Sequence, residues 1–168
     1  LFPGEYFGIT LFTSVLPGMI HMNSVTALCF ILLGTSLLFY SSNSRSRTAE
    51  RIAVAFGAIT AFCGIFSIVS FMTGSGISLD QFLPEVFRSP SRMAINTSFL
   101  FILTGTCSIF LYSRSNSVIN AVQSLLLLCG FVSLVAFLGY LYGISSFYDI
   151  ASVKAPMALN TSIAFNAV

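Results

Sequence analysis

The chain has 168 residues, of which 56% are hydrophobic and only 7% are charged, and its mean hydropathy is +0.94. Soluble domains carry about 25% charged residues because water must wet their surface, so this composition excludes an ordinary soluble domain. The net charge of +2 is too small to indicate nucleic-acid binding. We therefore expect an all-α integral membrane protein whose main partner is the lipid bilayer.

Apolar stretches without charge mark the expected membrane spans. Four complete spans are predicted at 24–40, 52–73, 94–112 and 118–141, and a fifth begins at 157–168. Each is predicted to be an α-helix, because the backbone must satisfy its own hydrogen bonds in lipid. The fifth stretch is shorter than the roughly 20 residues that cross a bilayer, so we expect the polypeptide to continue beyond Val168. Residues 1–20 contain Pro and Gly and are interpreted as an interfacial loop, with a re-entrant segment as the alternative.

Basic residues indicate the orientation. The short connections at 41–51 and 113–117 hold four basic residues and one acid, whereas the stretches on the other side, 1–20, 74–92 and 143–156, hold three basic residues and four acids. Lys and Arg are enriched in cytoplasmic loops. The short connections are therefore predicted to be cytoplasmic, and the fifth span is predicted to bring the C-terminus to the cytoplasmic side of the membrane.

One motif recurs at the start of three spans. Its pattern is Met-x-x-x-Thr-[Ala/Ser]-x-x-Phe, followed four residues later by Gly in the first two copies. The motif residues are Met22, Thr26, Phe30 and Gly34; Met93, Thr97, Phe101 and Gly105; and Met157, Thr161 and Phe165. The sequence therefore predicts a single membrane domain, 1–168, built from parallel repeats of a helical hairpin at 1–73, 74–142 and 143–168, the last one truncated.

The spacing of the motif has a geometric meaning. Residues four apart line one ridge of a helix, and a ridge with Thr and Gly is suited to close contact with another helix rather than with lipid. We call the first helix of each hairpin, which begins with the motif, the motif helix, and the second helix the return helix. Small residues four apart also occur in the return helices, at Ala53, Gly57 and Ala61 and at Gly139-x-x-x-Gly143. We therefore interpret the motif primarily as a helix-packing pattern.

A ligand pocket at the outer mouth of the bundle is the alternative interpretation of the polar motif residues. Its candidate ligand-binding residues are Thr26, Asn96, Thr97, Asn160 and Thr161. The first repeat has Val25 where the other two have Asn, so a role for that Asn is not shared by all repeats. Buried Thr hydroxyls often bond only to the carbonyl four residues earlier, which favours the packing interpretation.

Catalytic and metal-binding chemistry is not predicted. The four complete spans hold no ionisable residue in their interior, although such residues usually mark transport or proton relay. Cys29, Cys63, Cys107 and Cys129 lie in apolar stretches and have no metal-ligand spacing, so they are interpreted as small buried side chains. His21 lies beside Met19 and Met22, where a soft metal such as Cu(I) is a minor alternative to an interfacial role. We expect no catalytic residues, metal or cofactor.

Several strings resemble a known type of membrane region. They are Leu16-Pro-Gly-Met19, Thr26-Ala-Leu-Cys-Phe-Ile-Leu-Leu-Gly34, Gly76-Ile-Ser-Leu-Asp-Gln-Phe82 and Phe137-Leu-Gly-Tyr-Leu-Tyr-Gly143. Together they resemble the N-terminal multi-helix region of certain bacterial sensor histidine kinases and diguanylate cyclases, over nearly the whole chain. In that family, repeated segments of this kind precede cytoplasmic PAS, GAF, kinase or cyclase domains. The resemblance implies a location in a bacterial inner membrane and no agreed ligand.

The leading hypothesis is therefore a sensory input module for a cytoplasmic effector domain that follows Val168, without catalysis in these residues. A second copy of the chain, forming a homodimer, is a further expected partner. The alternatives are a transporter or channel subunit, for which internal repeats are common, and a structural subunit of a membrane complex. The repeats here share one orientation, and the spans lack buried charge, which weighs against transport.

Overall fold

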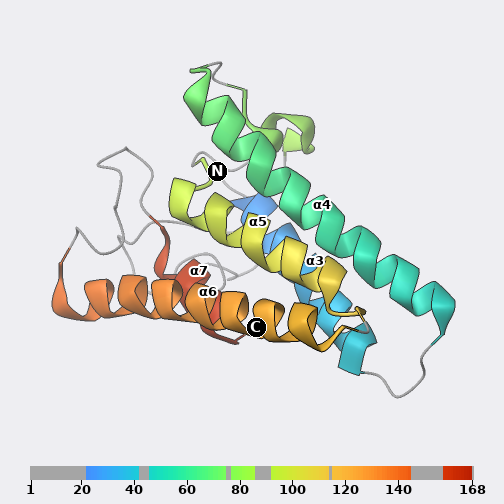
Figure 1. Cartoon of the computed structure of the whole chain (residues 1–168). Helices are drawn as coiled ribbons and strands as arrows, with labels where there is room; N and C mark the ends of the chain where they lie inside the picture. The colour runs from blue at the N-terminus through green and yellow to red at the C-terminus, as the bar shows by residue number, and fades with distance from the viewer. Residues whose placement is uncertain are drawn as a thin grey trace, which may run out of the picture.

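Helices make up the regular structure of the described part of the chain (Figure 1). The computed structural model describes residues 22–41, 46–74, 77–85, 92–113, 115–144 and 157–167. The elements are α3 (Ser24–Ser41), α4 (Arg47–Met72), the 3-10 helix η1 (Leu79–Phe82), α5 (Ile95–Phe110), α6 (Asn116–Tyr142) and α7 (Leu159–Ala167). The prediction of an all-helical architecture is confirmed for these residues. The predicted interfacial loop at 1–20, His21 and most of the loop 143–156 lie outside them.

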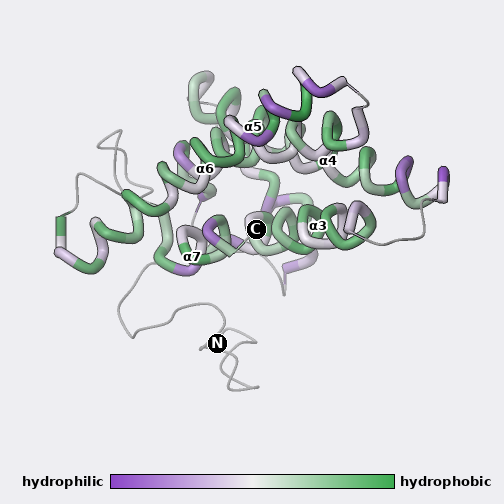
Figure 2. Tube along the Cα trace, turned by 60° about the horizontal axis from the view of Figure 1, so that its bottom comes forward, coloured by the Kyte–Doolittle hydropathy of each residue, from purple (hydrophilic) through white to green (hydrophobic). Residues whose placement is uncertain are grey.

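Three of these helices are long and apolar enough to cross a bilayer, namely α3, α4 and α6. Figure 2 shows hydrophobic residues along most of their length. The stretch predicted as a complete span at 94–112 differs, because α5 has only 16 residues and is about 24 Å long. Ala94 before it is extended, and Leu111 ends it. The chain is thus a membrane protein by its apolar helices, while a count of four complete spans is not established by the described residues.

The start of α4 differs from the sequence prediction. Residues 47–51 were expected in a loop, but α4 begins at Arg47, after Ser46. The Ser46 side chain accepts a hydrogen bond from the backbone N–H of Thr48 at 3.3 Å, which satisfies one of the free donors of the first turn. Glu50 adds a negative charge near the positive end of the helix dipole. The helix therefore extends past the apolar stretch and includes two arginines.

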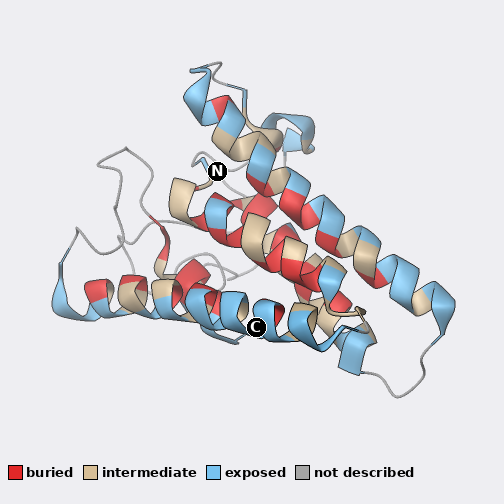
Figure 3. Ribbon diagram, in the orientation of Figure 1, coloured by how far each residue is buried: buried red, intermediate tan, exposed pale blue. Residues whose placement is uncertain are grey.

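The central helix of the bundle is α5. It lies between α4 and α6 in both views (Figures 1 and 2). Eight of its 16 residues are buried, compared with five of the 27 residues of α6. In Figure 3 the buried residues lie along the inward sides of the helices, and the outward sides are exposed. The short α5 is therefore surrounded mainly by protein, whereas α6 presents most of its surface outward.

Glycines bring α4 and α5 into close contact. A Cβ added to Gly105 would lie 2.6 Å from the carbonyl oxygen of Gly57 and 2.7 Å from the amide nitrogen of Ala61. About two turns further along both helices, a Cβ added to Gly64 would lie 2.5 Å from the carbonyl oxygen of Ser98. No real Cβ contacts a backbone atom so closely, so only glycine fits at these positions. The two helices pack backbone to backbone, as small residues allow in membranes.

The second return helix approaches the third motif helix in a related way. The hydroxyl of Ser133 in α6 donates to the backbone carbonyl of Ser162 in α7 at 2.7 Å. Ser162 directly follows the motif residue Thr161, just as Ser98 directly follows Thr97. The Ser162 carbonyl, which Ser133 contacts, therefore has the same motif position as the Ser98 carbonyl, which lies against Gly64. Each return helix therefore packs on the motif helix of the next repeat.

One predicted packing stripe has a different role in the structure. Gly139 in α6 is buried, but Gly143, four residues later, is exposed and has a left-handed conformation with φ of 67°. The backbone N–H of Ile144 donates to the carbonyl of Gly139 at 2.8 Å, which closes the end of the helix. The interpretation of Gly139-x-x-x-Gly143 as a helix-packing stripe is therefore wrong for Gly143, which ends α6.

We predict that Gly105→Ala destabilises the protein, whereas Gly34→Ala at the matching motif position does not. The added methyl group at 105 would overlap the α4 backbone and cost about 1–3 kcal/mol. At Gly34, no atom lies within 4 Å of an added Cβ among its described surroundings, so only the better helix propensity of Ala remains, worth up to about 1 kcal/mol. Thermal unfolding in detergent micelles, followed by circular dichroism, measures both. Equal melting temperatures for the two variants would contradict this packing.

Candidate functional site

The three motif phenylalanines contact one another where α3, α5 and α7 converge. The ring centroids of Phe30 and Phe101 are 5.0 Å apart, those of Phe30 and Phe165 are 4.6 Å apart, and those of Phe101 and Phe165 are 4.9 Å apart. Two of these pairs meet edge to face, the arrangement that aromatic rings prefer. We call these residues the phenylalanine cluster. It joins all three copies of the motif at one point in the core.

The other apolar motif residues differ in how they pack. Met157 is fully buried in the same core, and Met93 is half-buried against it, while Met22 is half-buried just before α3. Gly105 packs against α4, but no atom of the described residues lies within 4 Å of a Cβ added to Gly34. The motif residues of the second repeat are thus packed inward, whereas Gly34 faces open space in the described part of the chain.

The threonines proposed as ligand-binding residues are closed off from solvent. Thr26, Thr97 and Thr161 each have only 2% of their surface exposed. The two asparagines of that set, Asn96 and Asn160, are half-buried near the starts of α5 and α7. A ligand could therefore reach the threonines only if the motif helices moved apart, so ligand binding by this set stays a prediction.

Four hydroxyl groups of α4 and α5 form hydrogen bonds within their own helices. Thr60, Ser98, Thr104 and Ser108 each donate to the carbonyl four residues earlier, at distances of 2.8–3.0 Å. Such bonds leave no buried donor unpaired and need no partner from another helix. These small polar side chains therefore allow close packing without adding a polar site to the interior.

A buried carboxylate connects the loop after α4 to the start of α3. Asp80 in η1 is only 4% exposed, and its Oδ2 accepts from the Nδ2 of Asn23 and from the hydroxyl of Ser78, both at 2.7 Å. Its Oδ1 is buried and has no hydrogen-bond partner in the described part of the chain. We call Asn23, Ser78 and Asp80 the polar clasp.

Asn23 has a second role in the polar clasp. Its side-chain Oδ1 accepts from the backbone N–H of Val25 at 2.9 Å and, at 3.4 Å, from that of Thr26, so Asn23 caps the N-terminus of α3. The loop is fixed to α4 as well, because the hydroxyl of Ser70 donates to the carbonyl of Ile77. The clasp thus couples the position of the loop to the first turn of a motif helix.

The polar clasp is not predicted by the sequence. Asp80 was assigned only to an outer loop, because a contact between residues 57 positions apart leaves no mark in local periodicity. Two local signals were present: Asn23 directly precedes an apolar helix, and Ser78-x-Asp80 is typical of a turn in which a hydroxyl caps the following residues. Neither signal indicates that the two residues meet.

No metal site is formed by the described residues. They contain no group of three or more His, Cys, Asp or Glu side chains close enough to hold an ion. Cys29, Cys107 and Cys129 are buried, Cys63 is half-buried, and all four are free thiols. Comparison with known proteins gave no match to a protein family, to a curated protein or to a solved structure.

We predict that Asn23→Ala destabilises the protein by about 2 kcal/mol or more, because the change removes a helix cap and one of the two donors to the buried Asp80 carboxylate. The matched control is Asn120→Ala in α6, where the side chain is exposed and the effect should stay within about 0.5 kcal/mol. Chemical unfolding in micelles measures the difference. If both changes have the same effect, the polar clasp does not stabilise the fold.

Proposed function

We propose that this chain is a membrane-embedded sensory input module that passes a conformational signal to a cytoplasmic effector domain following Val168. The resemblance to the membrane regions of bacterial sensor histidine kinases and diguanylate cyclases supports this function. On this proposal the catalytic chemistry belongs to the effector domain, and the membrane module changes only the balance between its packed states.

The observation that carries the proposal is the phenylalanine cluster. Phe101 is fully buried, and its ring contacts Phe30 on one motif helix and Phe165 on another. Packed cores respond to a displacement by changing from one discrete arrangement to another, since side chains fill the space closely. A shift of α3 or α5 would therefore change the packing of α7, the last helix before the expected effector.

The polar clasp provides a route by which an outer stimulus could reach this cluster. Asp80 fixes η1 to Asn23, which caps α3 and lies seven residues before Phe30 of that helix. An event that displaces the loop would release the cap of α3 and alter the helix that contributes Phe30. The stimulus could therefore act through the loop without entering the closed interior.

The full topology of the proposal has four complete spans and a fifth that leads into the cytoplasm. The sorting of basic residues supports it, with Arg47 and Arg51 at the end of the bundle expected inside, and Asp80 and Glu85 at the other end. The short α5 fits a span whose ends are covered by protein rather than by lipid. A cytoplasmic C-terminus places the effector domain where nucleotides are available.

We predict that Phe101→Ala in the full-length protein changes basal kinase or cyclase output at least about fivefold, the lower limit of typical coupling between sites. Phe101→Leu, which keeps an apolar side chain, should shift the output in the same direction by less. Phe99→Ala is the matched control, because Phe99 lies on the same helix and is 51% exposed. Proteoliposomes with measured amounts of folded protein provide the assay.

Two results would contradict the sensor proposal. Unchanged output from folded Phe101→Ala and Phe101→Leu proteins would show that the phenylalanine cluster carries no signal. Solute flux through liposomes that hold only these 168 residues would support the transporter alternative instead. Thermal unfolding of each variant separates loss of signal from loss of fold.

We predict for the topology that a Glu85→Cys protein in intact cells reacts with a membrane-impermeant maleimide, whereas a Thr48→Cys protein reacts only after permeabilisation. Both positions are exposed; Thr48 lies in the first turn of α4, and Glu85 lies in the loop that follows α4 and η1. Labelling is compared with that of the parent protein, whose four cysteines are buried or half-buried. The reverse labelling pattern would place the arginine end outside and refute the proposed orientation.

A further inference from the structure

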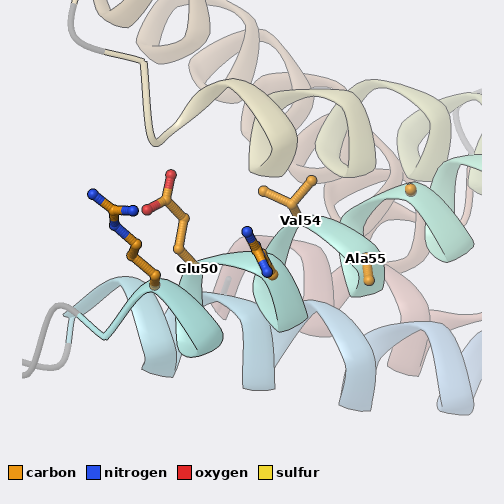
Figure 4. A pocket seen from close by; sticks show the side chains of 6 residues that line it. Glu50, Val54 and Ala55 are labelled. Carbon is orange, nitrogen blue, oxygen red and sulfur yellow. The ribbon is translucent and has the colours of Figure 1, made fainter.

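A pocket opens beside the first turns of α4, at the end of the bundle opposite the polar clasp (Figure 4). It is an open depression of about 490 Å³ on one side of α4, and that helix supplies all of its described lining residues: Arg47, Glu50, Arg51, Val54, Ala55 and Ala58. Figure 4 shows Glu50 near the start of the helix and the apolar side chains of Val54 and Ala55 further along its axis. The pocket is thus amphipathic along its length.

The polar end of the pocket favours an anion. Arg47 and Arg51 are four residues apart and therefore lie one turn apart on the same side of α4. Together with Glu50 they give the lining two positive charges and one negative charge. The start of α4 adds the partial positive charge of the helix dipole. Guanidinium groups present several N–H donors in a plane and bind phosphate oxygens in pairs.

The remainder of the pocket favours an acyl chain. Val54 is half-buried, and Ala55 and Ala58 are exposed small side chains on the next turns of a helix that is long and apolar enough to cross a bilayer. Small side chains leave room beside the helix, and the surface beyond them continues into the apolar part of α4. A soluble anion would leave this part of the pocket unused.

The pocket also lies at a depth that suits a lipid headgroup. Tyr40 at the end of α3 and Tyr112 after α5 pack edge to face at the same end of the bundle, with ring centroids 5.5 Å apart. Tyrosines are enriched where membrane meets water, because the ring is apolar and the hydroxyl is polar. The arginines therefore sit near the headgroup level, with the alanines on the hydrocarbon side.

We propose that this pocket binds an anionic phospholipid, with its phosphate between Arg47 and Arg51 and an acyl chain along Val54, Ala55 and Ala58. Basic pockets on membrane proteins select anionic headgroups in this way. Lipid binding here would tie the start of α4 to the bilayer surface. It would do so equally in a sensor and in a transporter.

The test titrates the purified protein with phosphatidylglycerol or phosphatidylcholine in micelles and counts bound lipids by native mass spectrometry. We expect the parent protein to bind phosphatidylglycerol more tightly than phosphatidylcholine. The double variant Arg47→Gln/Arg51→Gln should bind phosphatidylglycerol roughly 30-fold more weakly, because each arginine near a membrane surface contributes about 1 kcal/mol. Arg47→Lys/Arg51→Lys should retain part of the affinity, since the charge remains but the paired hydrogen bonds are lost.

Two controls separate this site from general charge effects. Arg92→Gln removes an exposed arginine at the other end of the bundle and should leave lipid affinity unchanged. Ala58→Phe fills the apolar part of the pocket, keeps both arginines and should also weaken lipid binding. Equal affinity for the two lipids, or unchanged phosphatidylglycerol binding in the double variant, would overturn the proposal. Displacement of the lipid by millimolar inorganic phosphate would assign the pocket to a soluble anion and overturn it as well.

Discussion

Direct contact between the backbones of α4 and α5 is the constraint on which the rest of the bundle depends. In a bilayer, apolar side chains gain little by leaving lipid for protein, so helices associate through close contact and hydrogen bonds. Gly57 and Gly105 provide that contact, and substitution of either would push the helices apart. With α5 held against α4, Phe101 is placed to meet Phe30 and Phe165. The position of the central helix therefore determines where the other two motif helices can pack.

Small residues with hydroxyl groups allow the close contact between α4 and α5 in an apolar interior. Ser98, Thr104 and Ser108 on α5 bond to their own helix and occupy little space. The only carboxylate buried among the described residues, Asp80, belongs instead to a loop at the end of the bundle, where two side chains donate to it. Among the described residues, the buried carboxylate therefore lies where a loop meets a helix, at one end of the bundle.

The sequence predicted the parts of this structure that depend on periodicity. Apolar stretches located the helices to within a few residues in most cases. The four-residue spacing predicted an inward ridge; the Thr and Phe residues of the motif pack in the core, whereas a Cβ added to Gly34 would contact nothing among the described residues. Local chemistry beyond the apolar stretch determined the early start of α4, where Ser46 caps a turn that contains Arg47. The polar clasp could not be predicted, because the pairing of Asn23 with Asp80 depends on how two hairpins are placed in space.

The two complete copies of the motif show that the packing of a motif residue depends on which helix lies beside it. Gly34 and Gly105 occupy the same motif position, yet only at Gly105 would an added Cβ meet another helix, because the backbone of α4 comes closest to the motif helix that follows it in the chain. On α3, Ile31 and Leu38 are 63% and 71% exposed. The hydrogen bond from Ser133 to Ser162 repeats the relationship at the next step, between α6 and α7. Each hairpin is therefore fixed by the one that follows, so a change in one hairpin must alter the contact surface offered to the next. The contacts between hairpins therefore follow one another along the chain, towards α7.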